Sequence, residues 1–207
     1  MLLEAGGNES AGLNVLKRIG RFFPEVPACG AGGEAVSYSP FMQDQTHTMI
    51  RAAVLKDAEQ IFDLIRSHRD DLISRPVGDI IQNIDRFVVC EVEGAVVGCA
   101  AWQILPEIGA PERASVEVQS VAVAEPYRRH HIGTRIVARI LDEVRRFQPA
   151  QAIVLTFAPK FFATLGFREI PKTQVMHKLY MGCINCTKHA NPFTCPEIAM
   201  ALDMSGR

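Results

Sequence analysis

The chain has 207 residues, of which 48% are apolar, and its 22 Lys and Arg nearly balance its 23 Asp and Glu, for a formal net charge of −1. This length can hold one ordinary domain with a full hydrophobic core and some additional chain. The composition and charge exclude a disordered chain and a basic nucleic-acid-coating protein, so we expect no nucleic-acid partner. No apolar run approaches the roughly 18 residues that a membrane-spanning helix needs.

Residues 1–48 are rich in Gly, Ala, Ser and Pro and show no sustained periodicity. They are predicted to form a poorly ordered N-terminal extension, with the domain starting at Met49. The first residues do not read as a secretory signal, because Glu4 and Glu9 interrupt the stretch and no basic region precedes an apolar one. With no export signal, the six cysteines indicate reduced thiols, and we expect a cytoplasmic location.

From residue 50 onward, strand and helix patterns alternate. The predicted strands are residues 50–55, two arms of a hairpin within 86–102 that reverses at Glu93-Gly94, then 114–125, 152–157 and 175–181. The predicted helices start at Ala58, Val77, Ile132 and Lys160, and Asp57 followed by Gln60 has the spacing of an N-cap with its capping-box partner. An early hairpin followed by βαβ units indicates an α/β fold with a mixed central sheet flanked by helices.

A basic turn, YRRHHIG at residues 127–133, directly precedes the apolar helical stripe that runs from Ile132 to Val144. Unpaired backbone N–H groups and the helix dipole favour phosphate at such a helix start. Arg128 and Arg129 add donors, and Gly133 removes a Cβ where the backbone approaches a ligand closely. The turn therefore predicts a site for a polyanionic ligand.

The run EVQSVAVAEPYRRHHIG, followed by VLTF and FFATLGFREI, resembles the GNAT superfamily of N-acetyltransferases over residues 50–181. The resemblance implies a mixed, mostly antiparallel sheet and a turn whose amides grip the pyrophosphate of acetyl-coenzyme A. His131 stands where the family motif has its middle glycine, and histidine tolerates left-handed backbone better than β-branched residues do. The coenzyme-binding residues that the resemblance implies are Val121, Ala122, Val123, Arg128, Arg129, His130, His131, Ile132, Gly133 and Thr134.

The segments IRAAVLKDAEQIFDLI, LISRPVGDIIQNIDRFVV and VLTFAPKFFATLGFREI look like the acetyltransferase half of bacterial N-acetylglutamate synthases. That branch implies transfer of an acetyl group to the α-amine of L-glutamate, the first step of arginine synthesis. Its full-length members carry a kinase-like domain ahead of this one, and 48 residues are too few for it. A short, stand-alone form is therefore expected, with arginine feedback in doubt and the oligomeric state, a homo-oligomer included, left open.

The chemistry needs a proton acceptor for the amine, a donor to the oxyanion and a route for the leaving thiolate. Glu117 is the predicted base, directly or through a water, with a solvated strand carboxylate as the alternative. The family analogy places the oxyanion donor at a backbone N–H near Val121. Phe162 stands where many relatives have a tyrosine acid, and Tyr127 and Tyr180 are poor substitutes. A thiolate is already a tolerable leaving group, since its conjugate thiol has a pKa of about 8.5.

A dianionic acceptor also needs cations for its carboxylates. By their positions in the synthase branch, Arg75 and Lys178 are implied as acceptor-binding residues, and Arg51 in the first strand is a third candidate. The alternative for each is an ordinary surface charge.

Residues 182–207 are predicted to form a cysteine-containing tail outside the domain. Cys183, Cys186, His189 and Cys195 supply the ligand types of a closed structural zinc site, although their spacing matches no familiar zinc module. A redox-active or merely exposed tail is the alternative.

Two rival functions remain open at this point. One is an acetyltransferase that modifies another amino acid, a small amine or a protein N-terminus. The other is a non-catalytic sensor of acyl-coenzyme A or amino acids, which Phe162 and the cysteine tail suggest.

Overall fold

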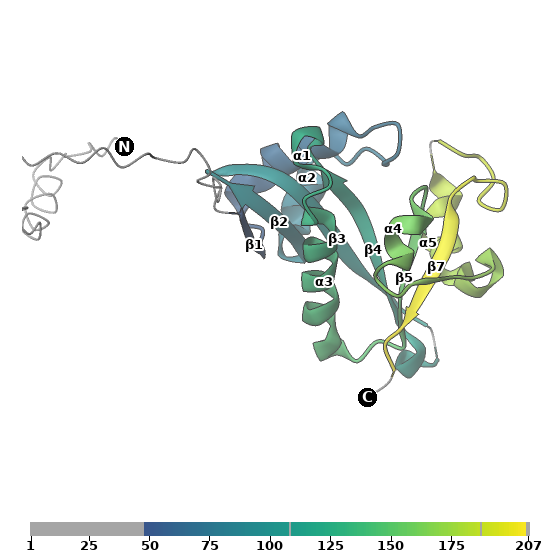
Figure 1. Ribbon diagram of the computed structural model, residues 1–207. Coiled ribbons are helices and arrows are strands. Elements are labelled where there is room, and N and C mark those ends of the chain that lie inside the picture. The colour runs from purple at the N-terminus through teal and green to yellow at the C-terminus, as the bar shows by residue number, and fades with distance from the viewer. Residues whose placement is uncertain (1–47, 108, 187, 206–207) are drawn as a thin grey trace, which may run out of the picture. The chain divides into compact units, whose positions relative to one another are not determined.

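The computed structural model describes residues 48–107, 109–186 and 188–205, so the predicted extension lies outside the described residues except for Thr48. Within them, seven strands form one sheet in the order β1-β2-β3-β4-β5-β7-β6 (Figure 1). The strands are β1 Thr48–Ala52, β2 Phe87–Val92, β3 Ala95–Leu105, β4 Ser115–Val123, β5 Gln151–Thr156, β6 Arg168–Glu169 and β7 Ile198–Asp203. The helices are α1 Ala58–Ser67, α2 Val77–Gln82, α3 Ile132–Val144, α4 Pro159–Ala163 and α5 Met176–Met181.

Every strand pair in this sheet is antiparallel except β4 with β5, which run parallel. The helix α3 provides the crossover between these two strands, as a parallel pair requires. The predicted mixed, mostly antiparallel sheet with flanking helices is therefore confirmed.

Helices cover both faces of the sheet (Figure 1). The helix α3 buries its stripe of Ile132, Ile136, Val137 and Ile140 against one face, in a cluster that also contains Val118. The helices α1 and α2 bury a second set on the opposite face, centred on residues such as Ile61 and Ile80. The apolar residues that recur at spacings of three and four in the sequence thus lie on the buried face of each helix.

The predicted reversal at Glu93-Gly94 joins β2 to β3. Both residues have positive φ, 51° for Glu93 and 83° for Gly94. A two-residue hairpin turn of this kind needs φ above zero at both positions, which glycine adopts without a steric penalty.

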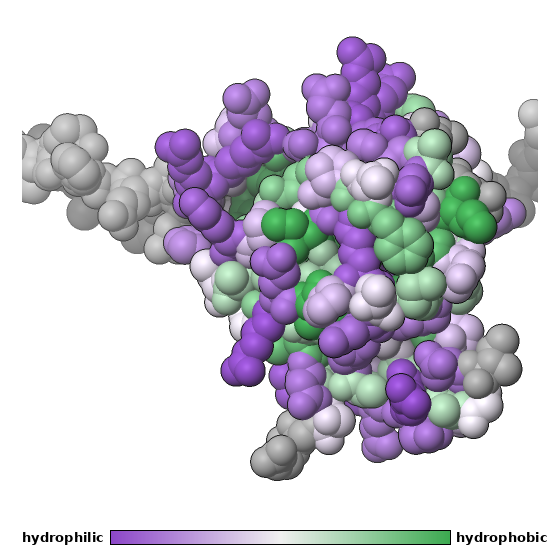
Figure 2. Space-filling view, turned by 90° about the vertical axis from the view of Figure 1, so that its right-hand side faces the viewer, coloured by the Kyte–Doolittle hydropathy of each residue, from purple (hydrophilic) through white to green (hydrophobic). Residues whose placement is uncertain are grey.

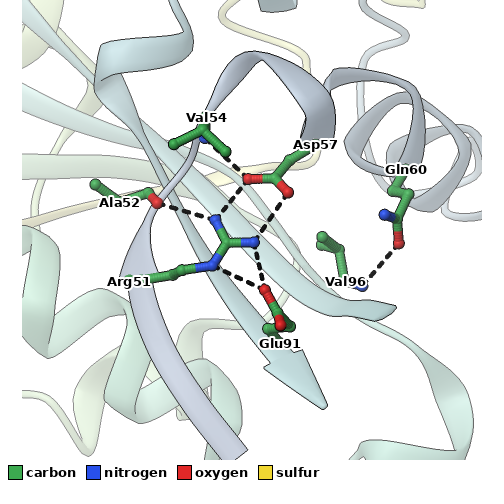
Figure 3. A network of polar contacts seen from close by, with 7 residues as sticks. All are labelled: Arg51, Ala52, Val54, Asp57, Gln60, Glu91 and Val96. Carbon is green, nitrogen blue, oxygen red and sulfur yellow. Dashed lines mark hydrogen bonds and ion pairs between the residues drawn. The ribbon is translucent and has the colours of Figure 1, made fainter. Parts of the chain in front are cut away.

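Two local predictions are wrong. Residues 176–181 form the helix α5 rather than a strand, because Val175 and Leu179, four residues apart, are the buried ones. The last strand is instead β7, which lies in the segment expected as a tail and pairs with β5. The other is the capping box: Asp57 is the N-cap residue of α1, as predicted, but its side chain makes no capping hydrogen bond. Gln60 instead accepts a hydrogen bond from the Val96 N–H (Figure 3).

No helix among the described residues is long and apolar enough to cross a membrane. On the face that carries the C-terminal elements, apolar side chains lie in separate groups between hydrophilic ones (Figure 2). The exposed large apolar residues include Tyr180, Met181, Ile184 and Phe193.

Candidate active site

The site begins where β4 and β5 separate. These strands pair only from Ser115 to Glu117 on β4, and then diverge. The register between β3 and β4 shifts nearby, and Ser120 has a φ of 55°, so β4 bulges at this point. A bulge bends its strand and leaves an extra residue outside the ladder. The result is a cavity of about 320 Å³ between the two strands, here called the splay cavity, whose lining includes Ser120, Val121, Leu155 and Phe162.

A second cavity, of about 590 Å³, lies against the basic turn and is called the turn cavity. Its lining includes Val121, Val123, Arg128, Arg129, His131, Ile132, Gly133 and Thr134, all from the predicted coenzyme-binding set. Ala122 does not line it, because alternation along β4 directs its side chain into the cluster beneath α1. His130 is exposed and also lies outside the lining.

His131, which stands at the place of the motif's middle glycine, adopts the left-handed conformation that histidine tolerates. It is the N-cap residue of α3, with φ 57° and ψ 14°, and Arg129 also has positive φ. No described side chain caps α3 through a hydrogen bond at this position. The first N–H groups of a helix have no partner within it, so the turn presents donors and dipole charge to the cavity.

We expect His131→Val to weaken acetyl-coenzyme A binding about 5- to 30-fold, because a β-branched residue in left-handed backbone costs roughly 1–2 kcal/mol and would distort the turn. His131→Gly should bind within about threefold of the wild type, since glycine adopts this φ freely. Calorimetric titration measures both affinities. Equal binding by the valine and glycine variants would show that the backbone of this turn does not control the site.

Gly133 has a structural reason to lack a side chain. An added Cβ would lie 3.3 Å from the ring of Phe161 on α4, and 3.7 Å from Val123. The glycine therefore lets α3 start close to α4, so that both elements bound the same cavity. Arg128 is tied to the end of β4, where its Nε donates to the Val123 carbonyl and its Nη2 lies 2.9 Å from His68 Nε2.

A third cavity, of about 350 Å³, lies on the face of α2 and α5 and is called the Glu117 cavity. It brings together Glu117 from β4, Lys178 from α5 and Arg75 from the segment before α2. It shares Ser120 and Leu155 with the splay cavity, which in turn shares Val121 and Val123 with the turn cavity. Three of the predicted site residues, far apart in sequence, thus surround one pocket next to the separated strands.

Glu117 is almost fully buried and pairs with Lys178, whose Nζ lies 2.8 Å from Glu117 Oε1. The second carboxylate oxygen, Oε2, is buried and has no hydrogen-bond partner among the described residues. Burial raises the pKa of Glu117, while the charges of Lys178 and Arg75 lower it and that of Glu197 raises it further. An unpartnered buried carboxylate oxygen is costly and favours a donor from a ligand.

Arg75 is held in place but keeps free donors. Its Nε donates to Ser120 Oγ at 3.0 Å, and its Nη1 donates to Asp79 Oδ2 at 2.6 Å. A guanidinium carries five N–H donors, so this geometry leaves others to bind an anion in the Glu117 cavity. The bond to Ser120 also ties Arg75 to the bulge in β4.

Arg51 is not brought to this site. Its guanidinium donates to both carboxylate oxygens of Asp57 and to Oε2 of Glu91 (Figure 3). Asp57 also accepts from the Val54 N–H at 2.8 Å, and its pKa is lowered chiefly by Arg51. Arg51 therefore fastens β1 to the start of α1 and to β2, and the expectation that it binds the acceptor is not met.

Phe162 is buried and lines the splay cavity, with its ring edge-on to Phe161 and Phe167. It supplies no proton donor. Tyr127 lines the turn cavity, whereas Tyr180 is 65% exposed on α5. Neither tyrosine lines the splay cavity.

Sequence reasoning missed Arg86. A polar cavity of about 210 Å³ adjoins the Glu117 cavity and shares Arg75, Asp79, Gln103 and Gln119 with it. Arg86 lines this Arg86 cavity and makes no ion pair with any described residue, although its guanidinium lies 5.9 Å from the centroid of the Trp102 ring. The only signal in the sequence was a basic residue at the start of a strand, which is too common to single out.

Sequence reasoning also missed Glu197, which lines both the splay cavity and the Glu117 cavity. It directly precedes β7, in the segment that was expected to lie outside the domain. Cys183 lines the Glu117 cavity as well, and burial raises its pKa. The described residues contain no cluster of three or more His, Cys, Asp or Glu side chains that could hold a metal, so the suggested zinc site is not formed by them.

Comparison with known proteins agrees with this geometry. Residues 83–169 match the family described as the acetyltransferase (GNAT) domain. The chain is 31% identical over 155 residues to an uncharacterized N-acetyltransferase of Chlorobaculum tepidum, and this match covers 74% of the chain and 94% of that protein. The chain belongs to the GNAT acetyltransferase family. It is an acetyl-coenzyme A-dependent N-acetyltransferase.

Two further relatives bear on the acceptor of this acetyltransferase. The amino-acid acetyltransferase of Mycobacterium tuberculosis is 31% identical over 137 residues, covering 64% of the chain and 75% of that protein. The crystal structure of Rv2747 from the same organism, in complex with CoA and NLQ, superposes with a TM-score of 0.63 at 25% identity. That superposition covers 75% of this chain and 98% of that one.

Proposed function

We propose that this acetyltransferase transfers the acetyl group of acetyl-coenzyme A directly to the α-amine of L-glutamate. The observation that carries the proposal is the buried Glu117 Oε2, which has no partner among the described residues and faces a pocket with free cationic donors. An acceptor ammonium would satisfy that oxygen. The similarity to proteins named amino-acid acetyltransferases supports an amino acid as the acceptor.

The same pocket offers a place for each charge of glutamate. The ammonium would donate to Glu117, and the α-carboxylate would bind the free donors of Arg75, which suit bidentate contact. The side-chain carboxylate would extend into the Arg86 cavity, whose cation makes no ion pair with a described residue. Lys178 would stay with Glu117 and keep it charged, rather than bind the acceptor directly as the sequence suggested.

The donor would lie along the other two cavities. Its pyrophosphate would bind at the start of α3, and its thioester would reach the bulge between the separated strands. There a backbone N–H near Val121 would stabilise the oxyanion. Because Phe162 cannot donate a proton, coenzyme A would leave as the thiolate and take its proton afterwards.

A thiol-release assay with acetyl-coenzyme A and a panel of amino acids, amines and peptides tests this function. Glutamate should be the preferred acceptor, with N-acetylglutamate identified as the product by mass spectrometry. Activity on lysine-rich peptides without activity on amino acids would refute the acceptor assignment. Tight coenzyme binding without transfer to any acceptor would instead indicate a sensor.

Two variants test separately which arginine binds the α-carboxylate of glutamate and which binds its side-chain carboxylate. Arg75→Ala should raise the KM for glutamate and for glutamine alike, by about 10- to 100-fold, because it removes one charge-assisted contact of roughly 1.5–3 kcal/mol to the shared α-carboxylate. Arg86→Met keeps an apolar contact to Trp102 and should raise the KM for glutamate by a similar factor, with at most about a threefold change for glutamine. An equal effect of Arg86→Met on both substrates would contradict its proposed role.

A further inference from the structure

His68 and Arg128 meet between the two cavities proposed for the donor. His68 is the C-cap residue of α1 and lines the splay cavity, whereas Arg128 precedes α3 and lines both the splay cavity and the turn cavity. The two residues are 60 positions apart in the chain, yet Arg128 Nη2 lies 2.9 Å from His68 Nε2. This contact joins the end of α1 to the end of β4, where the two cavities also share Val121 and Val123.

The neighbours of the His68 ring decide which of its nitrogens carries the proton. Nδ1 lies 2.8 Å from the Leu64 carbonyl oxygen, which can only accept a hydrogen bond. Nε2 lies 2.9 Å from Arg128 Nη2, which can only donate. The opposite tautomer would reach the Val123 carbonyl at 3.1 Å, but it would place an N–H against the Arg128 donor and a lone pair against Leu64. The neutral ring therefore donates from Nδ1 to Leu64 and accepts from Arg128 at Nε2.

Arg128 is an exposed side chain that two contacts hold in one orientation. Its Nε donates to the Val123 carbonyl at 3.3 Å, and its Nη2 donates to His68 Nε2. A guanidinium carries five N–H donors, so these two bonds leave others for an anion. Because an arginine loses rotamer freedom when it binds a ligand, a contact that holds it beforehand lowers the cost of binding.

We infer that His68 is a positioning residue for the donor, an assignment that rests on the donor half of the proposed function. Through Nε2 it holds Arg128 so that the free guanidinium N–H groups meet the diphosphate of acetyl-coenzyme A at the start of α3. His68 lines the splay cavity but not the turn cavity, so it acts through Arg128 rather than by touching the phosphates. Histidine suits this position because its neutral ring offers an acceptor without a second positive charge beside the arginine.

Paired substitutions at position 68 test the role of Nε2. At pH 8, His68→Leu should weaken acetyl-coenzyme A binding about 3- to 10-fold in calorimetric titration, because Arg128 loses one of its two contacts. His68→Gln should bind within about twofold of the wild type, because its amide oxygen can accept from Arg128 as Nε2 does. Both variants lose the bond from Nδ1 to Leu64, so the difference between them reports on Arg128. In kinetics, His68→Leu should raise the KM for acetyl-coenzyme A and leave kcat within about twofold.

The two neighbouring arginines of the turn supply the matched control. In an Arg128→Met background, His68→Leu should weaken binding by less than about twofold, whereas in an Arg129→Met background it should keep its full effect. An equal loss in both backgrounds would overturn the assignment, as would an equal loss for His68→Leu and His68→Gln. If His68→Leu lowers the unfolding temperature, the two backgrounds still decide, because damage to the fold would weaken binding in both.

The choice of ligand separates this assignment from the rest of the proposed function. Dephospho-coenzyme A keeps the diphosphate and lacks the 3′-phosphate, so His68→Leu should weaken its binding by the same factor. Loss of the effect with this ligand would overturn the assignment to the diphosphate. Binding needs no acceptor, so failure of the wild type to acetylate glutamate would overturn the proposed acceptor alone. A wild type that binds no acetyl-coenzyme A would overturn the place of the donor and the role of His68 with it.

Discussion

Replacing Lys178 by methionine should lower the free energy of unfolding by about 3 kcal/mol at pH 8, and by much less at pH 5. The Lys178 side chain is 15% exposed and that of Glu117 is 5% exposed, so the variant leaves a buried carboxylate without its counter-ion. Removing one partner of a buried ion pair costs roughly 3–5 kcal/mol, because the other charge remains desolvated. Urea unfolding at both pH values measures the difference.

The dependence on pH has a definite sign. Burial raises the pKa of Glu117 above its unfolded value even with Lys178 present, and loss of Lys178 removes the main opposing charge. A carboxyl with a raised folded pKa contributes stability that is present below its unfolded pKa, about 4.3, and is lost as pH rises through the folded pKa. At pH 5 the variant can therefore keep Glu117 protonated and neutral, whereas at pH 8 it must bury the charge or unfold.

A second substitution provides the matched control for this prediction. The double variant Lys178→Met with Glu117→Gln removes both charges and should recover most of the lost stability, with little dependence on pH. An equal loss at pH 5 and pH 8 for the single variant would show that packing of the Lys178 stem, rather than the charge on Glu117, causes the effect.

The features that follow local rules could be predicted from the sequence. The hairpin at Glu93-Gly94, the buried stripe of α3 and the left-handed His131 depend on neighbouring residues alone. The basic turn could be placed because a strand, a turn and a helix follow one another along the chain. Of these features, the basic turn with His131 and the start of α3 are the parts that would bind the donor.

The acceptor side could not be predicted in the same way, because it depends on long-range pairing. Residues 175–181 are a short apolar run, whose pattern fits a strand and a helix equally well. The packing of Val175 and Leu179 into the core decides for the helix. The short apolar run IAMALD forms β7 only by pairing with β5, and this pairing positions Glu197. The bulge at Ser120 has no signature in its own sequence, yet it sets where the strands separate.

Arg51→Met should lower the free energy of unfolding by about 2–4 kcal/mol at pH 7 while leaving the KM for the acceptor unchanged. The variant leaves the Asp57 carboxylate, whose side chain is 2% exposed, without its counter-ion. The Val54 N–H then remains as a hydrogen-bond donor to it. Because Arg51 lowers the folded pKa of Asp57, this stability is present above the unfolded pKa of about 3.9 and disappears as pH falls through the folded value. The difference between wild type and variant should therefore shrink at pH 3.

Arg66 offers a matched control for Arg51. It also pairs with an aspartate, Asp63, but both side chains are 64% exposed, so Arg66→Met should cost less than about 0.5 kcal/mol. Chemical denaturation at pH 3 and pH 7, with acceptor kinetics on each variant, distinguishes a structural cation from a binding one. A raised KM for glutamate with wild-type stability would show that Arg51 binds the acceptor. Lost stability with an unchanged KM would confirm that Arg51 instead holds β1 to the start of α1.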